Sequence, residues 1–182
     1  MTRRDALRLA ALGAAAPLAA ATASARADAV EDQKKQELAA MAAAVAGEQV
    51  TEVAYEAIAN SGLLGHAATG AMRVLLDHAK VHADSLGQGM KEQLGKDPPQ
   101  APKRTAIHGL AGMRRADDAL RLAMGLEQKA IAAHLVAVQK TGNALLLQAI
   151  AGVVASDAQH LVLLRQLLRR SPLPSAFERG AP

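Results

Sequence analysis

The sequence has no cysteine and no tryptophan, and it has only one tyrosine and one phenylalanine among 182 residues. Without cysteine there can be no disulfides, thiolate metal sites or cysteine nucleophiles, so histidine and carboxylate side chains remain as the strong metal ligands. Runs of β-branched or aromatic residues, which favour strands, are also missing. The excess of alanine and leucine over aromatic residues therefore predicts an all-helical domain, and the length suits one buried core.

The sequence also lacks the usual signatures of several function classes. It has neither a glycine-rich phosphate loop nor a nucleophile-elbow serine, so phosphoryl and acyl transfer have no support. Four of the 21 basic residues and one of the 17 acidic residues lie in the first 27 positions, which leaves the remainder with a net charge of +1. Without a basic stripe or stacking aromatics, we expect no nucleic-acid partner.

The N-terminal stretch resembles a twin-arginine export signal. The pair Arg3-Arg4 precedes an apolar, alanine-rich run of about 15 residues, and residues 25–27 form an A-x-A cleavage sequence. We therefore expect residues 1–27 to engage the twin-arginine export machinery and to be cleaved. The product would be a periplasmic or otherwise exported protein that is not embedded in the membrane. An uncleaved anchor is the alternative, although the run is short for a span and contains Pro17.

Apolar residues recur at alternating spacings of three and four, which is typical of helices that pack in a bundle. Gly62, Gly95 and Gly142 supply the signals that end the first three helices. The predicted helices span residues 30–60, 65–94 and 114–140, followed by a fourth that includes 149–168.

The second and third helices are separated by a connection of roughly 20 residues, long for a bundle loop. Pro98, Pro99 and Pro102 keep it from being helical. Short turns inside each helix pair and one long connection between the pairs predict two antiparallel hairpins joined by a crossover, as in ferritin-like bundles. We assign this four-helix bundle to residues 28–170 and a flexible tail to residues 171–182.

Polar residues occupy the inward seam of every predicted helix. Asp157 and His160 lie on the seam of the fourth helix, where leucines are expected, and burying them costs several kcal/mol unless they find partners or a metal. Glu48, His82 and Glu127 lie within about two turns of the midpoints of the other helices. Because antiparallel helices superpose at their midpoints, the five side chains should share one level, and a divalent metal would relieve the repulsion among the carboxylates.

This pattern resembles the ferritin-like superfamily, in which two helices each supply a Glu and two supply a Glu-x-x-His motif. Glu48 with Tyr55 and Glu127 with His134 repeat a seven-residue spacing, and Asp157 is followed by His160 after three residues. The stretch 76–86 is similar to exported bacterial ferritin-like domain proteins. The resemblance implies a core site for one or two Fe, Mn or Zn ions, with a redox or metal-storage role.

Three departures distinguish this chain from that pattern. Ala79 stands where a Glu should precede His82, Asp157 replaces a Glu, and His134 replaces a Tyr, so one bridging carboxylate is absent. Tyr55 and His134 are expected around the ligands rather than among them. Two further candidates are His78, one turn before His82, and Glu52, although an outward-facing His78 and a bundle-edge Glu52 are the simpler interpretations.

The sequence leaves two alternatives open. The first is a structural or interaction module whose polar core holds no metal, for which Ala79 is the best argument. The second is a carrier of apolar ligands, because an alanine- and glycine-rich core with few aromatics can leave cavities. Whether the protein is an enzyme stays open.

Overall fold

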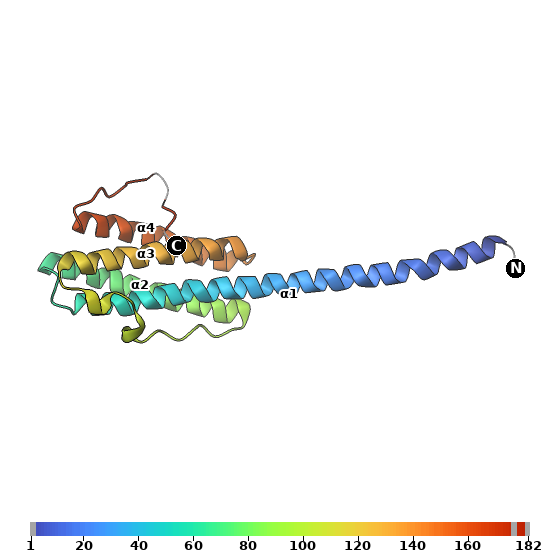
Figure 1. Cartoon of the computed structure of the whole chain (residues 1–182), viewed down its shortest axis with the longest axis horizontal. Helices are drawn as coiled ribbons and strands as arrows, with labels where there is room; N and C mark the ends of the chain where they lie inside the picture. Colours follow the sequence, from blue (N-terminus) through green and yellow to red (C-terminus); the bar gives the residue numbers. More distant parts are fainter. Residues whose placement is uncertain (1–2, 176–177, 181–182) are drawn as a thin grey trace. The chain divides into compact units, whose positions relative to one another are not determined.

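The computed structural model describes residues 3–175 and 178–180, with side chains described from residue 26 onward. Within these residues the chain forms four long helices and two short 3-10 helices (Figure 1). The elements are α1 (Arg3–Ala59), α2 (His66–Leu94), η1 (Arg104–Ala106), η2 (Leu110–Gly112), α3 (Ala116–Lys140) and α4 (Ala144–Leu167). The predicted all-α four-helix bundle is confirmed.

Helix α1 begins at Arg3, well before the predicted start near residue 30. Its early residues are rich in alanine, the residue with the highest helix propensity, so the backbone continues the helix. The chain divides into one unit of residues 1–36 and a second of residues 37–182, and the bundle belongs to the second. Side chains up to residue 25 lie outside the described part, so the export signal and its cleavage stay predictions.

The ends of the helices follow local sequence signals. Gly95 caps α2 in the left-handed conformation, with φ of 66°, and donates its N–H to the Lys91 carbonyl. The side chain of Asn143 caps α4 by accepting from the N–H groups of Leu145 and Leu146. Glycine tolerates positive φ without steric cost, which explains why α2 ends at the predicted Gly95. Asparagine satisfies free N–H groups at a helix start, which explains why α4 begins directly after Asn143.

The contacts between helices define the connectivity. Glu48 of α1 contacts His134 of α3. Seven residues later in α1, Tyr55 contacts Glu127, which lies seven residues earlier in α3. The helices α1 and α3 are therefore antiparallel. The α2–α3 connection runs back along the bundle (Figure 1), where the Gln49 side chain donates to the Pro99 carbonyl at 2.7 Å. The two predicted hairpins and the long crossover are therefore confirmed.

Two apolar clusters fill the core, one on each side of a polar level. One cluster includes Tyr55, Ile58 and Leu164, and the other includes Met41 and Ile150. Burying each large aliphatic side chain contributes about 1.5 to 3 kcal/mol to folding. The clusters thus hold the helices in register around the polar side chains that lie between them.

Helix α4 is the one described helix whose length and composition would suffice to cross a membrane. In the structure its inner face packs inside the bundle, and that face carries Asp157 and His160 together with apolar residues. One third of its apolar window is buried in the bundle, so its place in the core accounts for part of the apolar character of α4.

The described part of the tail returns to the bundle. Arg165, a buried residue of α4, pairs with Glu178 at 2.6 Å between Nη2 and Oε2. The flexibility predicted for residues 171–182 stays a prediction, but this ion pair fixes one point of the tail on α4.

Candidate metal centre

Six ionisable side chains meet between the two apolar clusters, and we call them the polar layer. Their side chains are 0 to 4% exposed, except that of His82, which is 12% exposed. The layer includes the five ligands predicted from the sequence and adds His134. Its members are Glu48 from α1, His82 from α2, Glu127 and His134 from α3, and Asp157 and His160 from α4.

The first half of the layer surrounds one side of Asp157. His82 Nδ1 lies 3.4 Å from Glu48 Oε2 and 3.3 Å from Asp157 Oδ1. His134 Nε2 lies 2.6 Å from Glu48 Oε1 and 3.3 Å from Asp157 Oδ2. Two imidazoles and two carboxylates therefore alternate within contact distance.

The second half consists of Glu127, His160 and Tyr55, again beside Asp157. His160 Nδ1 lies 2.9 Å from Glu127 Oε1 and 3.8 Å from Asp157 Oδ1. The phenol of Tyr55 donates to Glu127 Oε1 at 2.5 Å. In this half one imidazole, that of His160, faces two carboxylates, whereas in the first half two imidazoles face two carboxylates.

Asp157 is common to both halves. Glu48, His82 and Asp157 form one group, and Glu127, Asp157 and His160 form another, with ligand atoms within 4.8 Å of one another in each. Among the described residues, neither Asp157 oxygen nor His82 Nδ1 has a hydrogen-bond partner of acceptable geometry. These oxygen and nitrogen atoms lie close together without hydrogen-bonding one another, and a cation bound between them would satisfy them all.

The charges of the first half balance one another when its imidazoles are protonated. Burial alone would lower the pKa of His82, but the Asp157 and Glu48 carboxylates outweigh it and raise this pKa to about 9. Burial likewise tends to lower the pKa of His134, and the same two carboxylates outweigh it and raise this pKa to about 9. Burial tends to raise the pKa of Asp157, and the neighbouring His134 and His82 reverse this and lower it. Without a metal, this half is a compact ion-pair network.

The second half has the opposite character. Burial raises the pKa of Glu127, and the nearby Asp157 adds to this, against the lowering effects of His160 and Tyr55. Burial also raises the pKa of Tyr55 well above its usual value, so its phenol stays protonated and can donate to Glu127. Charge on Glu127 is thus less well compensated than charge on Asp157.

His134 and Tyr55 were both expected around the ligands, and both contact predicted ligands. His134 Nε2 contacts two of the predicted carboxylate ligands, Glu48 and Asp157. The Tyr55 phenol contacts Glu127. The nitrogen of His134 also lies close enough to these carboxylates to make it a further ligand candidate, and the role predicted for it stays a prediction.

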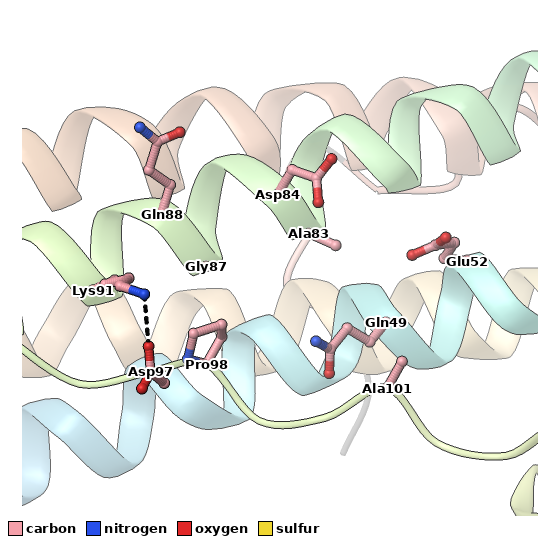
Figure 2. Close-up of a pocket in the computed structure, with 10 residues that line it drawn as sticks. All are labelled: Gln49, Glu52, Ala83, Asp84, Gly87, Gln88, Lys91, Asp97, Pro98 and Ala101. Atoms are coloured by element: carbon pink, nitrogen blue, oxygen red, sulfur yellow. Dashed lines mark ion pairs between the residues drawn. The ribbon is translucent and has the colours of Figure 1, made fainter.

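His78 and Glu52 lie at the edge of the layer. His78 is exposed, but its Nδ1 contacts His160 Nε2 at 2.9 Å instead of bonding outward. Glu52 and Asp84 face a surface pocket of about 650 Å³ between α1, α2 and the crossover, with the Lys91–Asp97 ion pair at its other end (Figure 2). Burial, with a contribution from Asp84, raises the pKa of Glu52. Glu52 is therefore a pocket residue outside both groups.

The residue that the ferritin-like pattern would make a bridging Glu is a buried alanine. Ala79 packs with apolar neighbours such as Leu75 and Leu76. Its methyl group cannot bind a metal, so Asp157 is the carboxylate common to both groups. The donor set is oxygen and imidazole nitrogen, which suits Fe, Mn and Zn alike.

The comparisons with known proteins agree with this architecture. A sequence model of the family described as ferritin-like domain matches residues 6–170. Among solved structures, the chain is similar to a conserved hypothetical protein, rv2844, from Mycobacterium tuberculosis, with a TM-score of 0.66 and 20% identity. This likeness covers 80% of this chain and 99% of the mycobacterial chain, and at that identity it supports the fold alone. A comparison with curated proteins gave no match.

Proposed function

The chain belongs to the ferritin-like domain family, and on that premise we propose that its polar layer binds one or two divalent transition-metal ions. Glu48, His82 and His134 would hold one ion, and Glu127 and His160 would hold the other. Asp157 would contact both. Fe, Mn or Zn fits this donor set, and a bound Fe or Mn would supply redox chemistry to a buried, water-poor site.

The observation that carries this proposal is the state of Asp157. Its carboxylate is buried, and among the described side chains neither oxygen has a hydrogen-bond partner. Its charge is balanced by the imidazoles of His82 and His134, whose nitrogens lie 3.3 Å from its oxygens. A cation between these atoms would supply that balance and give both oxygens a partner. Metal binding requires neutral imidazoles, so the ion would displace the protons that balance the first half in its absence.

The test is the metal content of the full chain purified without chelators. We expect at least one ion per chain, either as isolated or after anaerobic addition of Fe(II). Asp157→Asn, which keeps the shape and removes the charge, should lose the metal. Metal content well below one per chain in the unmodified protein, even after Fe(II) addition, would contradict the proposal.

A metal-free polar core is the second candidate function, that of a structural or interaction module. Two observations favour it: the buried Ala79 where a bridging Glu is expected, and the ion pairs that already compensate Glu48 and Asp157. It predicts that adding metal leaves the melting temperature unchanged, both in the unmodified protein and in the double variant Glu127→Gln/Asp157→Asn. A rise in the unmodified protein alone would support the metal site.

We further propose that residues 1–27 direct export of the folded protein to the periplasm. The support is the Arg3-Arg4 pair ahead of an apolar run and an A-x-A sequence. Arg3→Lys/Arg4→Lys should keep the full-length chain in the cytoplasm of a host that has the twin-arginine system. Unchanged localisation and N-terminal processing would contradict this part of the proposal.

A further inference from the structure

A cation that binds the polar layer must pass through a bundle wall that leaves only His82, of the six side chains of the layer, more than 4% exposed. The carboxylates of both groups are almost fully buried between the apolar clusters on either side. Apolar side chains do not coordinate a cation, so a path needs polar atoms that reach from the surface to a ligand. Two features of the described surface come close to the layer, namely His78 and the pocket that contains Glu52.

His78 connects solvent directly to a candidate ligand. Its side chain is exposed on α2, and its Nδ1 lies 2.9 Å from Nε2 of His160 on α4. The other nitrogen of the same His160 ring, Nδ1, lies 2.9 Å from Glu127 Oε1 inside the layer. One imidazole therefore has one nitrogen toward the surface residue and one toward the buried carboxylate.

A third imidazole lies alongside these two. The His82 ring stacks on His160 with centroids 5.7 Å apart, and His160 stacks on His78 at 5.2 Å. His82 retains partial exposure while its Nδ1 faces Glu48 and Asp157. Imidazole is a good ligand for Zn and Fe, so suitable nitrogen ligands are present from the surface to both halves of the layer.

The pocket in Figure 2 is the competing route, and its geometry is less favourable. Glu52 and Asp84 would attract a cation to it, but none of its lining residues belongs to either candidate ligand group. The Lys91 ammonium at its other end opposes a positive ion. The lining does hold one buried oxygen without a hydrogen-bond partner among the described residues, Gln49 Oε1, but Gln49 belongs to neither ligand group and its Nε2 is bonded to the crossover.

We propose that His78 is the entrance ligand through which a divalent cation reaches the polar layer, and this inference rests on the proposed function. The ion first binds His78 Nδ1 and His160 Nε2 in place of the hydrogen bond between them. With His160 Nδ1–H donating to Glu127, the proton of this hydrogen bond is on His78 Nδ1. It moves to His78 Nε2 through solvent as the ion binds, so this first step releases no net proton. The ion then exchanges these outer nitrogens for Glu127, Asp157 and the inward Nδ1 of His160, and the proton of Nδ1 moves to Nε2 as Nε2 releases the ion.

An entrance ligand changes the rates of loading and release but not the final affinity, because it stabilises the transition between the free and bound states. The probe is Co(II), whose visible absorption reports coordination, mixed with metal-free full-length protein; EDTA then measures release. In His78→Ala we expect both rates to fall by about tenfold, which corresponds to roughly 1.4 kcal/mol in each barrier. The dissociation constant and the final stoichiometry should match those of the unmodified protein.

Matched variants separate this role from others. His66→Ala removes another exposed histidine of α2, and Glu52→Gln/Asp84→Asn removes the acidic mouth of the pocket; both should load at the unmodified rate. Slower loading in the pocket variant alone would overturn the inference. A His78→Ala protein with faster release and weaker affinity would also overturn it, since His78 would then only hold His160 in place.

The same experiment distinguishes the inference from the proposed function. If the unmodified protein binds no Co(II), Fe(II) or Zn(II), the proposed function fails and the entrance role fails with it. If the unmodified protein binds Co(II) and His78→Ala loads at the same rate, only the entrance role is wrong. His78 is exposed, so its replacement by alanine should leave the fold intact, which circular dichroism can verify.

Discussion

The two halves of the polar layer share Asp157 but solve the problem of buried charge differently. In the first half, His82 and His134 face Glu48 and Asp157, and the pKa of each imidazole is raised to about 9. In the second half, Glu127 accepts from His160 and from the phenol of Tyr55, and its own pKa is raised by burial. The first half can be neutral with protons alone, whereas the second retains a poorly compensated carboxylate. A metal therefore competes with protons in one half and relieves unbalanced charge in the other.

The largest expected effect comes from breaking the residue that the halves share. Asp157→Asn should abolish binding in both halves, because the amide brings no negative charge to either group. Replacing a residue that only surrounds the ligands typically lowers metal affinity by about 10- to 100-fold. We expect Asp157→Asn to lower it by more than that. Isothermal titration with Zn(II) measures this, and retention of affinity within a few-fold would remove Asp157 from the site.

Separating the halves is the next test of the comparison. Glu127→Gln/His160→Asn should remove the second ion and leave the first, while Glu48→Gln/His82→Asn should do the reverse. Metal analysis after Fe(II) or Zn(II) loading would then show one ion fewer in each variant. If either pair of substitutions removes all metal, the two halves form one indivisible site.

The pH dependence of the metal-free protein tests the ion pairs of the first half. The pKa values of His82 and His134 are about 9 in the folded chain, above the usual 6.5. Their stabilisation is therefore complete below about pH 6.5 and is lost as the pH rises through about 9, by at most about 3 kcal/mol for each imidazole. Thermal melts in EDTA between pH 6 and 10 should show the decline.

His82→Gln is the matched variant for that measurement. Because one of the two raised pKa values is removed, the decline in melting temperature between pH 6.5 and 9 should become shallower. On the acid side, the pKa of Asp157 is lower in the folded chain than in the unfolded chain. Ionised Asp157 therefore stabilises the fold at a pH above its unfolded-state pKa, and this stabilisation is lost as the pH falls through its folded-state pKa. A melting temperature that is flat from pH 6 to 10 would mean that the imidazoles are not paired as described.

The smallest effect is expected for the hydroxyl that supports the second half. Tyr55→Phe keeps the buried ring and removes the donor to Glu127 Oε1, which should cost about 1.5 to 3 kcal/mol of stability in the metal-free protein. Thr51→Val removes a hydroxyl bonded to the Gly47 carbonyl of its own helix and should cost less than about 1 kcal/mol. Chemical denaturation measures both, and equal losses would assign no special role to Tyr55.

Much of the fold was predictable because it follows from local rules. The three-and-four spacing located the bundle faces, and Gly95 and Gly142 located helix ends within a few residues. The prolines 98, 99 and 102 identified the crossover. The start of α1 was not predictable in the same way, because an alanine-rich export-type sequence and a helix extension have the same helical propensity.

The candidate site was predictable at the level of the seam but not of its contacts. Polar residues at seam positions indicated a shared level, and Glu48, His82, Glu127, Asp157 and His160 do meet there. Which imidazole faces which carboxylate depends on rotamers and helix rotation, which spacing does not specify. Spacing therefore placed His134 around the ligands without showing that its Nε2 faces Glu48 and Asp157. Spacing also did not show that His78 contacts His160, because an outward hydrogen bond was the simpler interpretation for that residue.

The most direct test of the shared Asp157 is a crystal of the full chain soaked with Fe(II), Mn(II) or Zn(II) and measured at the metal's absorption edge. We predict anomalous peaks on the two sides of the Asp157 carboxylate, one toward Glu48 and His82 and the other toward Glu127 and His160. No anomalous peak within coordination distance of Asp157, in crystals shown to contain the metal, would contradict the metal-binding account and leave the bundle with a purely polar core.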